Sequence, residues 1–273
     1  MGRGAIRTGL LAALLLATGC GGGAGGRVLR VGSDIEYAPI EFYKENTTQP
    51  QGLDYDLAQA LGKKLGAKVT FTNDTDFAGI IGALRAGRFD IVMSAMNDTP
   101  ERRGKGVDFI DYFRAGSSIL VQKGNPKGIR SPDDLCGMTV AVQQGTTQDT
   151  GILTPQEAKC PAGKGLRVLR FEKDADALQQ VKNGRAVADV EDFPVAAYNA
   201  ATSGGGADFD VVPQQVGDIG SYGIAVPTGN TALRDSLQSA LRAIIQDGTY
   251  DEILTRWKVT AGALKTAAVN GGS

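Results

Sequence analysis

Histidine is absent from all 273 residues of the chain, and this absence excludes several kinds of chemistry. Histidine is the most common general base, the usual zinc ligand and the base of Ser-His-Asp and Cys-His catalytic systems. An excess of charge of one sign is also lacking, because 29 Lys and Arg stand against 30 Asp and Glu. Without a broad basic field to hold a phosphate backbone, we expect no nucleic-acid partner. We also expect no metal or cofactor.

Cysteine is scarce, and the first of the three lies in an N-terminal segment that is typical of export. Arg3 and Arg7 precede an apolar run at 10–17 that is shorter than the roughly 20 residues of a membrane span. This pattern predicts a signal peptide over 1–19. The run ends in "ATGC", which resembles a bacterial lipobox, so Cys20 would be lipidated and 20–26 would form a flexible Gly-rich tether. An ordinary buried helix is the alternative.

Cys136 and Cys160 are the remaining cysteines. If the chain is exported, they meet an oxidising compartment, and we expect them to form a disulfide. A loop of this length contributes roughly 3 to 4 kcal/mol when it is closed, according to the chain-entropy model. Two buried free thiols are the alternative.

Short β-type runs alternate with helical patterns along the chain. Leu53, Leu57, Leu61 and Leu65 recur every fourth residue, which is the stripe of an amphipathic helix. The runs at 27–33, 67–72, 89–95, 118–123, 138–143, 166–171 and 222–227 predict strands. This order indicates an α/β fold built from βαβ units. The segments "VTFTNDTDFAGIIGALRAGRFD" and "VLRFEKDADALQQVKNGRAVAD" share one pattern about a hundred residues apart, which fits two similar lobes.

The stretch "MNDTPERR" directly follows the β-type run "FDIVMSA". Thr99 is a favourable helix N-cap and Pro100 a favourable first helical residue, so a strand leads straight into a helix N-terminus. Such an end attracts anions, and Arg102 adds a planar fork that suits a carboxylate. The alternative is that Arg102 pairs with an acid at the surface.

Several motifs in this order resemble the family 3 extracytoplasmic solute-binding proteins of ABC transporters for polar amino acids. They are "GLDYDLAQALGKKLG", "FAGIIGALRAGRFDIVMSAMNDTPERR", "VDFIDYF", "VAVQQGTTQ" and "ALRDSLQSALRAIIQDGTYDEILTRW". The resemblance implies a periplasmic-binding-protein-like fold of type II, with two α/β lobes, a two-strand hinge and a ligand cleft between them. Lobe 1 would span 27–117 plus 222–260, lobe 2 would span 118–221, and 261–273 would be a flexible tail.

The resemblance also implies roles for individual residues. Arg102 and Thr147 would hold the α-carboxylate of an amino acid, and Asp192 would receive its α-ammonium group. The end of the third strand would contact the same zwitterion through Ser94, Ala95 and Asn97, with Ala95 using its backbone. The ligand's side chain would lie against Tyr37, Phe77 and Asp34. Glu36 and Glu41 add to the acidity there, which hints at a cationic or polar amide ligand unless these acids are solvated or paired with Lys44.

These patterns favour a lipid-anchored, monomeric binding protein on the extracytoplasmic face of the bacterial membrane, which delivers a polar amino acid to an ABC permease. An enzyme on the same fold, similar to cyclohexadienyl or arogenate dehydratases, is the alternative. In that case Glu36, Glu41 or Asp192 would handle protons. A sensor module is a third reading, but it would need a transmembrane span and a signalling domain after the binding lobes.

Overall fold

The computed structural model describes residues 1–2, 26–73 and 75–272. The predicted signal peptide, Cys20 and the tether fall on residues outside this part of the chain, apart from Met1, Gly2 and Gly26. Within the described residues, the helices are all too short or too polar to cross a membrane.

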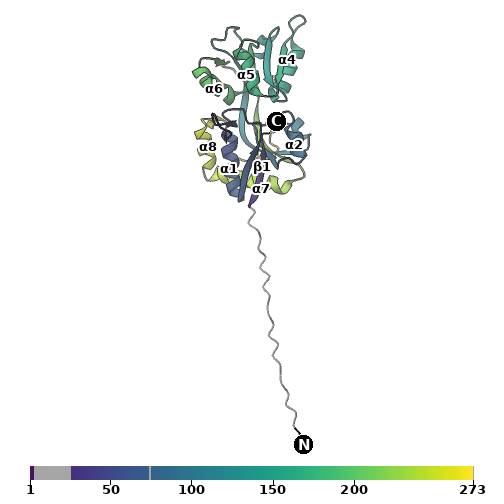
Figure 1. Cartoon of the computed structure of the whole chain (residues 1–273). Helices are drawn as coiled ribbons and strands as arrows, with labels where there is room; N and C mark the ends of the chain where they lie inside the picture. Colours follow the sequence, from purple (N-terminus) through teal and green to yellow (C-terminus); the bar gives the residue numbers. More distant parts are fainter. Residues whose placement is uncertain (3–25, 74, 273) are drawn as a thin grey trace.

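Two α/β lobes lie one above the other (Figure 1). Lobe 1 contains β1 (Arg27–Gly32), the β2–β3 hairpin (Phe42–Tyr43, Pro50–Gln51), α1 (Leu53–Leu65), β4 (Ala67–Thr72), α2 (Ile80–Arg85), β5 (Ile91–Val92), α3 (Pro100–Arg103), α7 (Thr231–Gln246) and α8 (Thr249–Arg256). Lobe 2 contains β7 (Thr139–Gln143), α4 (Thr154–Lys159), β8 (Arg167–Phe171), α5 (Asp174–Lys182), β9 (Ala188–Asp192), α6 (Phe193–Thr202) and β10 (Phe209–Val211). Short 3-10 or π turns complete the fold at Pro132–Leu135, Gln148–Leu153, Ser203–Gly205 and Thr260–Gly262.

Two long antiparallel strands, β6 (Val107–Gln122) and β11 (Val216–Pro227), run through both lobes. The sheet order is β4-β1-β5-β11-β6-β9-β7-β8, with β10 also paired to β6. The pairing of β6 with β11 shifts register between Val216 and Gly220. The connection between the lobes is therefore a strand pair with an interrupted ladder. The predicted fold class, two α/β lobes with a two-strand connection, is confirmed. The exact lobe boundaries stay a prediction.

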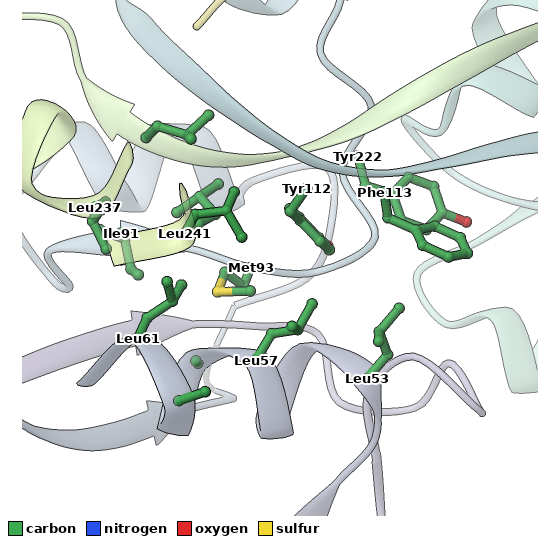
Figure 2. Close-up of a cluster of buried hydrophobic side chains, with 14 of the residues drawn as sticks. Leu53, Leu57, Leu61, Ile91, Met93, Tyr112, Phe113, Tyr222, Leu237 and Leu241 are labelled. Carbon is green, nitrogen blue, oxygen red and sulfur yellow. The ribbon is translucent and has the colours of Figure 1, made fainter. Parts of the chain in front are cut away.

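The predicted leucine stripe forms the buried face of α1 (Figure 2). Leu53, Leu57 and Leu61 are fully buried and face the core of lobe 1, where Leu237 and Leu241 of α7 belong to the same cluster. Burial of a Leu side chain contributes roughly 1.5 to 3 kcal/mol relative to exposure, so these residues fix both helices on the sheet. Lobe 2 has its own apolar clusters on both sides of β7 and β9.

Cys136 and Cys160 form a disulfide with Cα atoms 5.4 Å apart, as predicted. The bond joins the end of the Pro132–Leu135 turn to the end of α4. It therefore closes a loop in lobe 2, and Cys160 packs against the apolar cluster of that lobe.

The C-terminal segment differs from the flexible tail that the sequence suggested. Ala267 is buried, Val269 bridges to Ile110, the Asp111 N–H donates to the Ala268 carbonyl (2.9 Å) and the Asn270 N–H to the Phe109 carbonyl (3.0 Å). In lobe 1, β6 has β11 on one side only, and the C-terminal segment covers its other edge. The small, polar composition of this segment suggested fraying. Composition does not reveal main-chain pairing, and main-chain hydrogen bonds hold the segment in place here.

Candidate functional site

The predicted site residues meet in one cleft between the lobes. Its lining is Asp34, Tyr37, Glu41, Phe77, Ser94, Ala95, Asn97, Arg102, Gln143, Thr146, Thr147, Gln148 and Asp192. All nine residues predicted to bind ligand are in this set. The remaining space is about 20 Å³, which is room for a water molecule rather than an amino acid. Any larger ligand therefore enters only when the two walls of the cleft separate.

Arg102 is held at the start of a single helical turn. Thr99 caps α3 by accepting a hydrogen bond from the Arg102 N–H (3.2 Å), and Pro100 is the first helical residue, as predicted. The side chain is buried: Nη1 donates to the Asn97 carbonyl (2.9 Å) and Nη2 to the Gly145 carbonyl (3.1 Å). The guanidinium lies 5.2 Å from the centre of the Phe77 ring.

The two hydrogen-bond acceptors of the Arg102 guanidinium are neutral carbonyls, so these contacts do not compensate its charge. Burial lowers the pKa of Arg102 to about 10, which still keeps the group charged at neutral pH. Because a guanidinium has five N–H donors, and two of the contacts are to carbonyls, donors remain for an anion. The surface ion pair considered as an alternative for Arg102 is not what the structure contains.

Asp192 ends β9 and lies just before α6, on the lobe 2 wall. Its carboxylate accepts hydrogen bonds from Gln148 Nε2 (2.9 Å) and Tyr37 Oη (3.1 Å), and its N–H donates back to Tyr37 Oη (2.9 Å). Burial raises the pKa of Asp192 to about 6, although these hydrogen bonds and Arg102 lower it. The cleft thus holds a cation on lobe 1 and an acid on lobe 2.

The end of β5 carries an unusual backbone conformation. Ala95 has a φ of 45°, in a region that residues with a side chain rarely occupy. Its N–H donates to Asp54 Oδ2 of α1 (3.0 Å), so this donor, expected to face a ligand, is engaged within lobe 1. Ser94 Oγ donates to Glu41 Oε1 (2.9 Å) and accepts from the Asp34 N–H (3.0 Å). Rare backbone conformations such as that of Ala95 cluster at ligand-binding sites.

Acidic side chains gather at the other end of the cleft. Asp34 is ion-paired with Lys173 and accepts a hydrogen bond from Gln143 Nε2 (2.7 Å). Burial raises the pKa of Asp34 even though Lys173 lowers it, and burial together with Asp54 raises the pKa of Glu41 well above its usual value. The predicted acidity is present, but Asp34 pairs with Lys173 rather than Lys44, and Glu36 is exposed outside the lining.

The two walls of the cleft touch each other directly. Tyr37 reaches Asp192, and Asp34 reaches both Lys173 and Gln143. Thr147 Oγ1 donates to Asn97 Oδ1 (2.9 Å), and Arg102 contacts Gly145. Each contact joins lobe 1 to lobe 2, so in this structure the lobes are closed on one another.

Gln143, Gln148 and Lys173 were not singled out from the sequence. The two glutamines belong to the motif "VAVQQGTTQ", where Gln143 ends β7 and Gln148 follows Thr147. Their position beside a predicted ligand residue was the available signal. Lys173 precedes α5 and had none, because its partner Asp34 is 139 residues away in the other lobe.

Two lobes joined by paired strands, with a cleft of opposite charges between them, define a binding protein for a small charged molecule that closes around its ligand. The model of the bacterial extracellular solute-binding proteins, family 3, matches residues 29–260. The chain belongs to this family.

Curated relatives and solved structures agree with this assignment. The chain is 32% identical to the arginine-binding protein ArgT of Corynebacterium glutamicum, over 89% of this chain and 78% of that protein. It is 32% identical to a probable histidine-binding protein of Neisseria gonorrhoeae, over 87% and 85%. Among solved structures, an ancestral arginine-binding protein bound to arginine is 38% identical, with a TM-score of 0.77 and coverage of 84% of this chain and 97% of that one.

Proposed function

We propose that this chain is the substrate-binding subunit of an ABC importer and captures a cationic amino acid, with arginine as the first candidate. The observation that carries the proposal is the charge of the cleft lining: one buried arginine faces three carboxylates. A zwitterion satisfies Arg102 and one acid. Of the two acids that remain, Asp34 would pair with a positive charge on the ligand's side chain in place of Lys173, and Glu41, whose pKa is raised by burial, would add a hydrogen bond.

The backbone end of the ligand would be held between the lobes. Arg102 would bind the α-carboxylate, with help from Asn97 and Thr147, and Asp192 would accept hydrogen bonds from the α-ammonium group. These charged hydrogen bonds are strong because the groups are buried and shielded from water. Since Arg102 lies on lobe 1 and Asp192 on lobe 2, the ligand would bridge the lobes and favour closure.

The side chain of the ligand would extend toward Asp34 and Glu41. Tyr37 and Phe77 would form the walls over its aliphatic part, and Ser94, whose hydroxyl contacts Glu41, would support the acidic end. Lys173 is ion-paired with Asp34 in the closed lobes, so a cationic ligand would have to displace the Lys173 ammonium group.

The names of the relatives support a basic amino acid without deciding which one. Arginine-binding proteins occur in Bacillus subtilis and Escherichia coli among the curated relatives, and histidine-binding proteins occur beside them. One ancestral arginine-binding protein was also solved with glutamine. A precursor of cyclohexadienyl dehydratase, 41% identical, is itself named an amino acid-binding protein, which favours binding over the dehydratase alternative.

We further propose that lipidated Cys20 anchors the chain on the outer side of the membrane and that it works as a monomer. The "ATGC" motif and the short apolar run before it support the anchor. A diacyl anchor gives lasting attachment because two chains add their burial free energies.

Calorimetric titration of residues 27–273 decides between these ligands. After removal of bound ligand by unfolding and refolding with the disulfide intact, we expect arginine to bind more tightly than glutamine. Arg102→Ala removes a charged contact worth roughly 2 to 4 kcal/mol, so affinity should fall roughly 30- to 1000-fold. Arg130→Ala, an exposed arginine of lobe 2, is the control and should bind normally. Equal affinity of Arg102→Ala and wild type would contradict the proposal.

A further inference from the structure

Three buried carboxylates lie together inside lobe 2, away from the cleft lining. Asp174 begins α5, and Asp189 and Glu191 lie on β9. They are 5%, 0% and 1% exposed, and one oxygen of each lies within 4.8 Å of one oxygen of the others. The composition pointed to no metal because histidine is absent, but carboxylates alone can form an oxygen-ligand site.

This cluster has unsatisfied polar atoms that point to a missing partner. Within the described residues, neither oxygen of Asp189 has a hydrogen-bond partner, and neither has the fully buried hydroxyl of Ser118. Ser118 is the register partner of Glu191 across β6 and β9, so both side chains lie on the same face of the sheet. The Ser118 hydroxyl is thus a further unpaired oxygen on the face of the sheet that carries Asp189 and Glu191.

The surroundings of Asp189 are apolar. Its register partners are Leu120 of β6 and Ala141 of β7, and both belong to the cluster beneath α5 and α6. An ionised carboxylate in such a place costs several kcal/mol unless a cation or a proton neutralises it. The salt bridges of the described residues include none to Asp174, Asp189 or Glu191. Asn199 Nδ2 donates to both oxygens of Glu191 (3.3 and 3.0 Å) and supplies no charge.

The oxygen donors of the cluster favour one kind of ion. Calcium binds oxygen ligands at about 2.3 to 2.6 Å in a flexible geometry, and one oxygen of each acid lies close enough to the others, within 4.8 Å, for all three to reach a single ion. Magnesium, at about 2.1 Å, needs a tighter shell and retains water, which a fully buried site does not favour. Carboxylate and hydroxyl oxygens are also poor ligands for copper or zinc compared with nitrogen and sulfur.

We propose that Asp174, Asp189 and Glu191, together with the Ser118 hydroxyl, form a calcium site in lobe 2. The ion would tie α5 to β9 and β6 directly behind the ligand cleft, since Lys173 and Asp192 are the immediate neighbours of Asp174 and Glu191 in the chain. Shared protons are the competing way to neutralise the acids, because burial raises the pKa of all three.

Metal analysis and thermal unfolding distinguish calcium from protons. The full mature chain is stripped with a chelator at pH 7.5, dialysed against calcium chloride with excess magnesium, and its metal content measured. We expect one calcium ion per chain and a rise in unfolding temperature of several degrees on adding calcium alone. Asp189→Asn should lose the bound ion and the thermal shift, whereas Asp176→Asn, an exposed acid on the same helix, should retain both.

The outcomes separate calcium binding from folding and from the proposed transport role. If wild type binds no calcium, or if Asp189→Asn binds as much as wild type, the proposal is wrong. If Asp189→Asn fails to fold, Asp174→Asn and the wild-type stoichiometry still decide. Should Asp189→Asn be more stable than wild type without any calcium effect, the acids share protons instead. Amino-acid titration of the same samples tests the proposed function separately, because Arg102 and Asp192 are unchanged.

Discussion

At the residue scale, Lys173 occupies a place that a cationic ligand would need. Its ammonium group pairs with the buried Asp34 across the cleft. We predict that Lys173→Met raises the affinity for arginine roughly 5- to 10-fold, because the ligand no longer competes with an internal cation for Asp34, and a partly buried ion pair is worth about 1 kcal/mol or more. Calorimetric titration of the variant measures this change.

The matched control is Lys182→Met, at the other end of α5. Lys182 pairs with Asp208 outside the cleft, so its loss should leave arginine affinity unchanged. If Lys173→Met instead binds arginine more weakly, Lys173 helps the lobes to close and does not compete with the ligand.

Part of this site was accessible from sequence because its residues lie in local motifs. Thr99, Pro100 and Arg102 form a cap, a helix start and a cation within four positions, and the structure contains this turn. Lys173 could not be found in the same way. Its role depends on contact with Asp34 after the lobes close, and local spacing does not encode such a contact.

At the element scale, the docked C-terminal segment supports the ligand-binding turn. The Gly272 N–H donates to Asp98 Oδ2 (2.8 Å), and Arg103 Nη1 bridges the Gly272 carbonyl (3.1 Å) and Asp98 Oδ1. Asp98 and Arg103 flank the cap and helix that hold Arg102. The segment therefore fixes the position of α3 as well as covering the edge of β6.

We predict that deleting 264–273 lowers both the unfolding temperature and the arginine affinity. The exposed β6 edge and the loss of the Gly272 contacts to Asp98 and Arg103 should cost about 2 kcal/mol of stability, or several degrees. Thermal unfolding and titration of the truncated chain test this, with Lys265→Ala in the full chain as the control, because Lys265 is exposed. A truncated chain that melts and binds like wild type would show that the segment only rests on lobe 1.

Elements with strong periodicity were predicted well, and those stabilised by distant pairing were not. The leucine stripe placed α1 correctly because its pattern is local. The strand predicted at 118–123 is only the last part of β6, which begins at Val107. Its first part was not among the predicted strands, and pairing with β11 and with the C-terminal segment keeps it extended.

At the scale of the whole molecule, each lobe buries acidic side chains of its own, on both sides of the cleft. In lobe 1, Asp54 of α1 is fully buried and faces Glu41 and Tyr112. Burial raises the pKa of Asp54 to about 7, with a smaller lowering effect from hydrogen bonds, and raises that of Glu41 further. Because folding raises the pKa of both acids, the free energy of unfolding should fall as pH rises.

The sign follows from proton uptake. Between about pH 4 and 7 the folded chain keeps Asp54 protonated, while the unfolded chain, with an ordinary pKa near 3.9, has released the proton. The folded state therefore binds more protons, and the free energy of unfolding falls as pH rises, by up to roughly 1.4 kcal/mol per pH unit for one proton. We predict that the chain, freed of amino acid and calcium, is more stable at pH 5 than at pH 8.

Denaturant unfolding at pH 5, 6, 7 and 8 in the presence of a chelator measures this slope. Asp54→Asn keeps an acceptor for the Ala95 N–H but cannot ionise, so its unfolding free energy should vary less with pH and exceed that of wild type at pH 8. Glu252→Gln, an exposed acid on α8, should keep the wild-type slope. If wild-type stability is constant or rises from pH 5 to pH 8, Asp54 and Glu41 are already ionised in the folded chain, and a positive charge near them must neutralise the pair.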